Sequence, residues 1–327
     1  MSNDAKEVRF HSPLAPLMQQ FVEEKRACGH RYHEQARQLA RLDRALASES
    51  VTASTLPRAA MQCWLTKRPH ESPGTHQHRI SIARQFAQFM CRLGYLAYVP
   101  PRWPLTRESR TFVPHIFTRA EVAALLDRID HLPPTPHSPD RHLVMPEIFR
   151  LLYGCGFRVN EVLQLRVADV DLDRGVITVR DGKFGKDRLV PPHITLVQRL
   201  RRYTDFFGER PDKAFFFPSR QDQPYRNNAV YLVFRKALFQ LRIPHGGKSK
   251  GPRVHDLRHC FAVHSLLRWY EEGVDLNAKL PILATYLGHQ TLKGTQRYLH
   301  LTAELFPEIN QRVTATFGDV IPRRVVS

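Results

Sequence analysis

Apolar side chains in the first hundred residues recur at the spacing of α-helices. Between residues 14 and 26 they fall three or four positions apart, on one helical face: Leu14, Leu17, Met18, Phe21 and Val22. The same period predicts helices over residues 32–47, 56–67 and 80–93. Gly29 follows the first helix, where a glycine suits the left-handed residue that ends many helices. We therefore expect residues 1–100 to form a helical domain.

A proline-rich stretch separates this region from the rest of the chain. Pro100, Pro101, Pro104 and Pro114 fall close together. Because proline lacks an amide donor and disrupts helices, this stretch is expected to be extended. We place a linker at residues 101–116 and a second domain at residues 117–327.

The second region begins with a helix signal and contains a short hairpin. Thr118 precedes Glu121 by three residues at the start of an apolar run, which is the capping-box pattern. A strand at 176–179 and its return at 188–190 flank a turn at Asp181-Gly182. Helical spacing fills much of the remainder, at residues 146–153, 159–165, 194–207, 228–241, 255–270, 280–287 and 303–317. The chain is predicted to be mainly α with a small antiparallel β-sheet.

The charge of the chain indicates a polyanionic partner. Its 327 residues include 49 Lys and Arg against 31 Asp and Glu, a formal net charge of +18. Such an excess favours nucleic acid, because binding releases counterions from the phosphates. Both regions share the excess, and the face of the second predicted helix opposite its apolar stripe carries Arg37, Arg41 and Arg44. These three arginines are predicted to contact DNA.

The five cysteines and the N-terminal sequence bear on location. The cysteines are scattered and form no Cys-x-x-Cys pair, which argues against a disulfide framework or a zinc ribbon. The N-terminus lacks the apolar core of a signal peptide, and no segment is apolar over the length of a membrane helix. We expect a cytoplasmic, nucleoid-associated protein with no contact to a membrane.

Three short motifs bring together cations and histidines. Arg158 stands between a glycine-rich break and a predicted helix start, where its planar fork can reach a phosphate. Glu161 follows one turn later and could hold that guanidinium, although the pair alone is equally typical of a surface ion pair. His255, Arg258 and His259 share one helical face. Two histidines at i and i+4 also resemble half of a zinc site, but no third ligand is evident.

The remaining chemistry is spread over the hairpin and the C-terminal third. Lys183 and Lys186 occupy the turn between the two strands, where an ammonium could protonate a leaving hydroxyl. His289 follows Leu287-Gly288 and could donate to a phosphate oxygen. Tyr298 follows nine residues later, and a tyrosine hydroxyl can attack phosphorus as a nucleophile. Further cations that we predict to bind DNA are Arg188, Lys248 and Lys250.

Taken in order, these motifs resemble the tyrosine recombinases, the lambda-integrase-like family. The pattern is Gly-Leu-Arg-x-x-Glu, a lysine hairpin, His-x-x-Arg-His, Leu-Gly-His and a terminal tyrosine, and it covers about residues 117–310. By this resemblance Arg158, Arg258 and His289 bind the scissile phosphate, and His255 assists proton transfer. Lys183 protonates the 5′-oxygen, with Lys186 as its rival, and Tyr298 forms a 3′-phosphotyrosine. The family needs no metal and no cofactor.

The resemblance also implies an assembly. A helical core-binding domain and a mixed α/β catalytic domain would form a C-shaped clamp on duplex DNA with inverted-repeat core sites. A protein that is monomeric in solution would act as a homotetramer through a Holliday junction, with accessory or sister recombinases as further partners. A C-terminal helix over residues 303–317 would dock on its own domain or on a neighbour. The sequence near residues 279–300 is similar to transposon-associated members.

Alternative functions remain open at this point. They are a DNA-binding accessory protein without catalysis, a type IB topoisomerase-like relaxing enzyme, and a metal-dependent nuclease. The DNA target, and the choice between integration, excision and resolution, depend on groove contacts and DNA shape that no single motif encodes.

Overall fold

The computed structural model describes residues 8–47, 49, 51–102, 113–180, 187–220, 222–247 and 251–301, without the side chains of His300 and Leu301. The chain divides into two compact units, Met1–Val113 and Pro114–Ser327. The predicted helix at 303–317, together with Lys183, Lys186, Lys248 and Lys250, lies outside the described residues.

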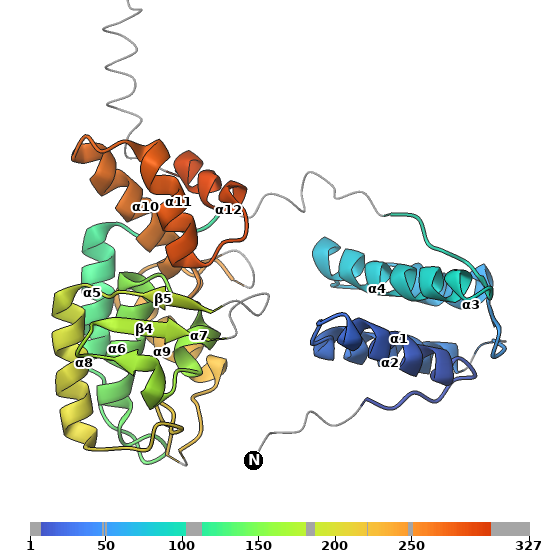
Figure 1. Cartoon of the computed structure of the whole chain (residues 1–327), viewed down its shortest axis with the longest axis horizontal. Helices are drawn as coiled ribbons and strands as arrows, with labels where there is room; N and C mark the ends of the chain where they lie inside the picture. Colours follow the sequence, from blue (N-terminus) through green and yellow to red (C-terminus); the bar gives the residue numbers. More distant parts are fainter. Residues whose placement is uncertain are drawn as a thin grey trace, which may run out of the picture. The chain divides into compact units, whose positions relative to one another are not determined.

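The first unit is a bundle of helices (Figure 1). Its elements are α1 Ala15–Ala27, α2 His33–Leu46, β1 Thr55–Leu56, α3 Arg58–Leu65, α4 Pro73–Arg92 and β2 Leu96–Ala97. The two short strands pair in parallel, an element that the apolar pattern did not predict. Helix α4 begins seven residues before its apolar run because Ser72 caps it, with Thr75 N donating to Ser72 Oγ at 3.1 Å.

The face of α2 that carries the three predicted DNA-binding arginines is exposed. Arg37, Arg41 and Arg44 lie on the solvent side, opposite the buried Ala36, Leu39, Leu42 and Leu46. The buried Asp43 accepts hydrogen bonds from His11 N and Ser12 N at 2.6 and 2.9 Å, which fixes the incoming chain against the helix. The exposed side chains of Arg37, Arg41 and Arg44 take no part in the apolar core of this unit.

The second unit packs a small sheet by one of its faces against a group of helices. Its elements are α5 Arg119–Asp130, α6 Arg141–Gly154, α7 Val159–Leu163, the 3-10 helix η2 Val167–Asp169, β3 Val170–Asp171, β4 Val176–Val179, β5 Arg188–Val190, α8 Ile194–Phe207, α9 Asn227–Gln240, α10 Asp256–Glu271, α11 Leu276–Leu287, α12 Leu292–Gln296 and the 3-10 helix η3 Arg297–Leu301. The strands are antiparallel in the order β3-β4-β5. The predicted class, mainly α with a small antiparallel sheet, is confirmed.

Two apolar clusters hold this unit together. The larger joins α5, α6, α8 and α9 to the sheet, and Phe149 stacks on Phe234 at its centre. The smaller cluster fills the space between α10 and α11 and includes the ring of Tyr298. The smaller cluster thus joins the C-terminal elements to α10.

The predicted capping box of α5 is confirmed, since Glu121 N donates to Thr118 Oγ1 and Thr118 N donates to Glu121 Oε2.

No helix in the described part of the chain is both long enough and apolar enough to cross a bilayer.

Candidate active site

Four segments bring together the predicted catalytic side chains that the structure describes, which leaves out Lys183. Arg158 caps the N-terminus of α7, while His255 precedes the first residue of α10. Arg258 and His259 follow within the first turn of α10. His289 comes directly after Gly288, which ends α11 in the left-handed conformation at φ 67°, and Tyr298 lies on η3. Residues from four places in the sequence therefore converge on one region of the second unit.

Arg258 lies at the centre of this region and is 1% exposed. Its Nη1 donates to the carbonyl of Gly156 at 2.6 Å, and its Nη2 donates to the carbonyl of Leu287. Burial, and next the charge of Arg158, lower the pKa of Arg258 to about 10, so the guanidinium stays charged at neutral pH. Both hydrogen-bond partners are neutral carbonyls, which leaves a buried positive charge that an anion would stabilise.

The glycine that supplies one of these carbonyls has little freedom to change. Gly156 has a φ of 61°, in the left-handed region. A Cβ built there would lie 2.6 Å from Phe261 and 2.8 Å from Leu287. Glycine is therefore needed both for the turn and for the close approach of α10 and α11.

Arg158 and Arg188 share one carboxylate. Glu161 accepts from Arg158 Nη1 at 2.6 Å and from Arg188 Nη1 and Nη2 at 3.0 and 2.8 Å. Burial would raise the pKa of Glu161, but the hydrogen bonds and charges of the two arginines outweigh it and hold the pKa at about 2. Arg158 keeps 23% of its side chain exposed, whereas Arg188 keeps 10%. The side chain of Arg188, predicted to contact DNA, thus lies against Glu161 in this structure.

The histidines of the site are uncharged at neutral pH. Burial, followed by the charges of Arg258 and Arg158, lowers the pKa of His255 and of His289 to about 4, although His255 keeps part of its surface exposed. His289 Nδ1 lies 2.7 Å from the hydroxyl of Thr295, which is fully buried. The hydroxyl holds one ring nitrogen of His289, which leaves Nε2 for another partner.

Tyr298 is 2% exposed and belongs to the same region. Its hydroxyl lies 3.1 Å from His259 Nδ1, and its ring lies near the ring of His289, with centroids 6.1 Å apart and planes inclined by 24°. Burial raises the pKa of Tyr298, while the charge of Arg258 acts in the opposite direction. A tyrosine hydroxyl is therefore held within the group of cations and histidines of its own chain.

Other features of the site carried no signal in the sequence motifs. The carbonyls of Gly156 and Leu287 are main-chain groups, and Thr295 is one of several threonines near the end of the chain. The helical period did predict that His255 and His259 share a face, and their rings are perpendicular with centroids 4.9 Å apart. The buried Asp256, between these histidines, accepts from Arg253 N at 2.9 Å.

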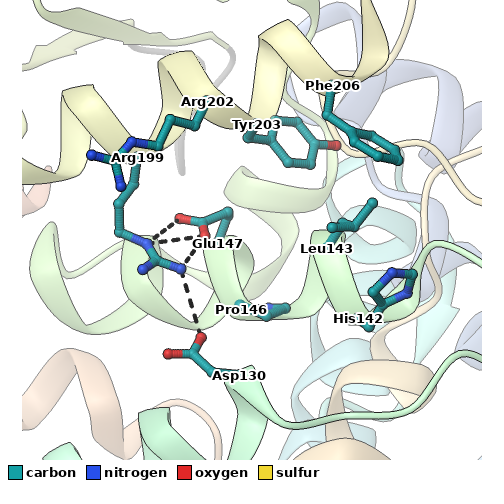
Figure 2. A pocket seen from close by; sticks show the side chains of 9 residues that line it. All are labelled: Asp130, His142, Leu143, Pro146, Glu147, Arg199, Arg202, Tyr203 and Phe206. Atoms are coloured by element: carbon teal, nitrogen blue, oxygen red, sulfur yellow. Dashed lines mark hydrogen bonds and ion pairs between the residues drawn. The ribbon is translucent and has the colours of Figure 1, made fainter.

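A second polar cluster lies in a separate pocket of about 480 Å³, between α5, α6 and α8 (Figure 2). Arg199 Nη2 lies 2.7 Å from Glu147 Oε1 and 3.6 Å from Asp130 Oδ1. The charges of these groups compensate one another, and the ion pair of Arg199 with Glu147 joins α8 to α6. Among the described residues, no group of three or more His, Cys, Asp or Glu side chains is placed to hold a metal ion.

The chain is similar in sequence to known proteins. Residues 116–304 match the model of the phage integrase family. Tyrosine recombinase XerD of Ralstonia nicotianae is 33% identical over 235 residues, which cover 70% of each chain. An integrase/recombinase of Sinorhizobium fredii, y4rB, is 29% identical over 316 residues, which cover 94% of this chain and 99% of that protein.

Solved structures share the fold. The Tn1549 transposon integrase, in complex with a circular intermediate DNA, has a TM-score of 0.60 at 18% identity, covering 86% of this chain and 94% of its own. The XerH recombinase bound to its difH substrate has a TM-score of 0.56 at 16% identity, covering 85% of this chain and 77% of its own.

Proposed function

The chain belongs to the phage integrase family of tyrosine recombinases, and we propose that it cuts and rejoins DNA at defined sites through a 3′-phosphotyrosine on Tyr298. Its biological task would be the integration, excision or resolution of a mobile element. A site-specific recombinase must break a phosphodiester without losing its bond energy, and covalent attachment to a tyrosine stores that energy.

The observation that carries this proposal is the buried charge of Arg258, whose side chain donates to main-chain carbonyls, in the same region as the hydroxyl of Tyr298. A guanidinium that is 1% exposed and bound to carbonyls is suited to an anion. Arg158, still partly exposed, can contact a second phosphate oxygen. A phosphate between them would become more negative in the transition state, where fixed cations stabilise it most. The nucleophile and the anion site thus occupy one region of the chain.

The reaction balances with the residues named from the motifs. The hydroxyl of Tyr298 would lose its proton to the neutral imidazole of His255, and its oxygen would form a bond to phosphorus as the bond to the 5′-oxygen breaks. Lys183 would give the departing oxygen its proton, with Lys186 as the alternative donor. His289 would donate from Nε2 to a non-bridging oxygen while Thr295 holds Nδ1, and His255 would assist proton transfer. Attack of a 5′-hydroxyl on the phosphotyrosine would reverse the step and rejoin the strand.

Duplex DNA is the partner that we propose for cations of both units. Arg37, Arg41 and Arg44 on α2, together with Lys248 and Lys250, would contact phosphates flanking the cleavage site. The core-binding region at 1–100, the linker at 101–116 and the catalytic domain at 117–327 would form a clamp. Four copies would assemble on inverted-repeat sites, exchange strands through a Holliday junction and use the helix at 303–317 as a docking element.

The test uses nicked suicide duplexes tiled from the DNA that flanks this gene, with EDTA present. Wild type should form an SDS-resistant adduct linked to a 3′ end, and Tyr298→Phe should bind the same duplex without an adduct. The matched control is Tyr231→Phe, on an exposed part of α9, which should form the adduct normally. An adduct with Tyr298→Phe would overturn the assignment of the nucleophile. Relaxation of supercoiled plasmid without a defined site would favour the topoisomerase alternative.

A further inference from the structure

The contact between His259 and Tyr298 has no counterpart among the roles that the motifs assign. His259 Nδ1 lies 3.1 Å from the hydroxyl oxygen of Tyr298, with ring centroids 5.5 Å apart and planes inclined by 54°. His259 lies on α10 and Tyr298 on η3, so this bond joins the element that carries Arg258 to the one that carries the nucleophile. Both side chains are largely withdrawn from solvent.

The direction of this hydrogen bond follows from the positive charge near the tyrosine. The charge of Arg258 acts on Tyr298, and a nearby cation favours a hydroxyl whose oxygen faces it. The hydrogen of the hydroxyl is then left for His259. Burial, the neighbouring His255 ring and then the charge of Arg253 lower the pKa of His259 to about 3, so its imidazole is neutral at pH 7. A neutral ring can present a lone pair at Nδ1 and keep its proton on Nε2.

We propose that His259 is a positioning residue, which accepts the hydroxyl hydrogen of Tyr298 at Nδ1 and thereby turns an oxygen lone pair towards the phosphorus. This inference rests on the proposed function, since it needs Tyr298 to be the nucleophile. A phenol rotates freely about its C–O bond, and only one part of that rotation leaves a lone pair aimed at the phosphate. The neighbouring histidines face other groups: His289 Nδ1 meets Thr295, and the His255 ring is perpendicular to that of His259.

Three substitutions separate this role from simple packing. In His259→Asn the side-chain amide oxygen falls near the place of Nδ1 and can accept the same hydrogen. In His259→Gln the amide falls near Nε2, away from the tyrosine. His259→Phe keeps the ring shape and removes both nitrogens. Single-turnover adduct formation on the suicide duplex should stay within roughly tenfold of wild type for Asn. It should fall roughly 100-fold for Gln and Phe, the cost of a small misplacement of reacting groups.

Duplex affinity and thermal unfolding of all three variants are measured alongside, and both should stay close to wild type. Equal rates for Asn and Phe would overturn the proposal, because packing alone would then account for His259. So would a wild-type rate in His259→Phe. Failure of wild type itself to form an adduct would sink the proposed function, which is a different and separately visible result.

A modified duplex supplies the last control. Replacing the 5′-bridging oxygen by sulfur gives a leaving group that departs without a proton. The defect of His259→Phe should persist on this duplex, because the hydroxyl of Tyr298 is still misdirected. Recovery to the wild-type rate would place His259 on the leaving-group side and overturn the inference.

Discussion

Arg188 and Glu161 form a two-point ion pair, with Nη1 3.0 Å from Oε1 and Nη2 2.8 Å from Oε2. Arg188 also donates from Nε to the carbonyl of Tyr286 at 3.0 Å. The strand β5 is thereby linked to α7 and to the end of α11. Arg188 fixes Glu161, and Glu161 in turn holds Arg158. An arginine that we expected to contact DNA therefore holds Arg158 in place through their shared carboxylate.

Glu161→Gln should weaken the fold in a pH-dependent way. The folded pKa of about 2, against 4.5 for a free glutamate, corresponds to roughly 3 kcal/mol of stability. Because the folded pKa is depressed, this contribution is present above about pH 4.5 and is lost as the pH falls towards 2. Denaturant unfolding of both proteins from pH 7 to pH 3 should therefore show a difference that shrinks with acid. A difference that does not change with pH would contradict it.

Arg258→Lys should bind DNA but cleave poorly. An ammonium cannot span the carbonyls of Gly156 and Leu287 while facing a phosphate, so the fixed charge is misplaced. We expect adduct formation to fall by about 100- to 1,000-fold, in line with the loss of one oxyanion contact. Arg268→Lys, on the same helix but with 60% of its side chain exposed, is the matched control and should cleave normally.

Thr295→Val should impair cleavage with little effect on duplex affinity. The substitution keeps the shape of the buried side chain but removes the hydroxyl that holds His289 Nδ1. Without it, the ring can adopt either tautomer and rotate, and we expect adduct formation to fall roughly 10- to 100-fold. Thr285→Val, at an exposed position of α11, tests the substitution itself. Equal behaviour of the two variants would remove Thr295 from the site.

Gly156→Ala should destabilise the catalytic unit well beyond the strain of its backbone. A left-handed alanine costs about 1–2 kcal/mol, and here its Cβ would also meet Phe261 and Leu287 at less than 3 Å. Gly273→Ala is the control, since Gly273 has a φ of 72° with no atom within 4 Å of an added Cβ. In thermal unfolding, the free energies of unfolding of the two variants should differ by several kcal/mol. Similar melting temperatures would contradict the close packing at Gly156.

The spacing of apolar residues predicted the long helices well, but it did not predict the shortest strands. The apolar period placed one helix at residues 194–207, the bounds of α8, because one of its faces is buried along the whole length. The strands β1 and β2 have two residues each, too few for any alternation to appear. Helix α4 begins at Pro73, and the buried residues before its apolar run, His76 and Arg79, are polar, so no apolar side chain marks the period there.

The sequence predicted the part of the site that consists of reactive or charged side chains in the motifs. It did not predict the contacts that support them. The order of Arg158, His255, Arg258, His289 and Tyr298 was informative because each contributes a reactive or charged group. The sequence did not predict that the side chain of Arg188 contacts Glu161. These two residues belong to different motifs, and the lysines next to Arg188 favoured an interpretation as a DNA contact. The contact of Thr295 with His289 could not be predicted from the sequence either, since only its complete burial beside that ring distinguishes this threonine.

The anchoring of Arg258 by two carbonyls has a consequence for how this sequence can drift over generations. A contact made by a peptide oxygen survives any exchange of the side chain on the same residue, provided the backbone path is kept. Leu287 could therefore be replaced by another apolar residue without removing the acceptor that it offers to Arg258. Selection at this point acts on the course of the chain, while the identity of the residue is held only by its packing.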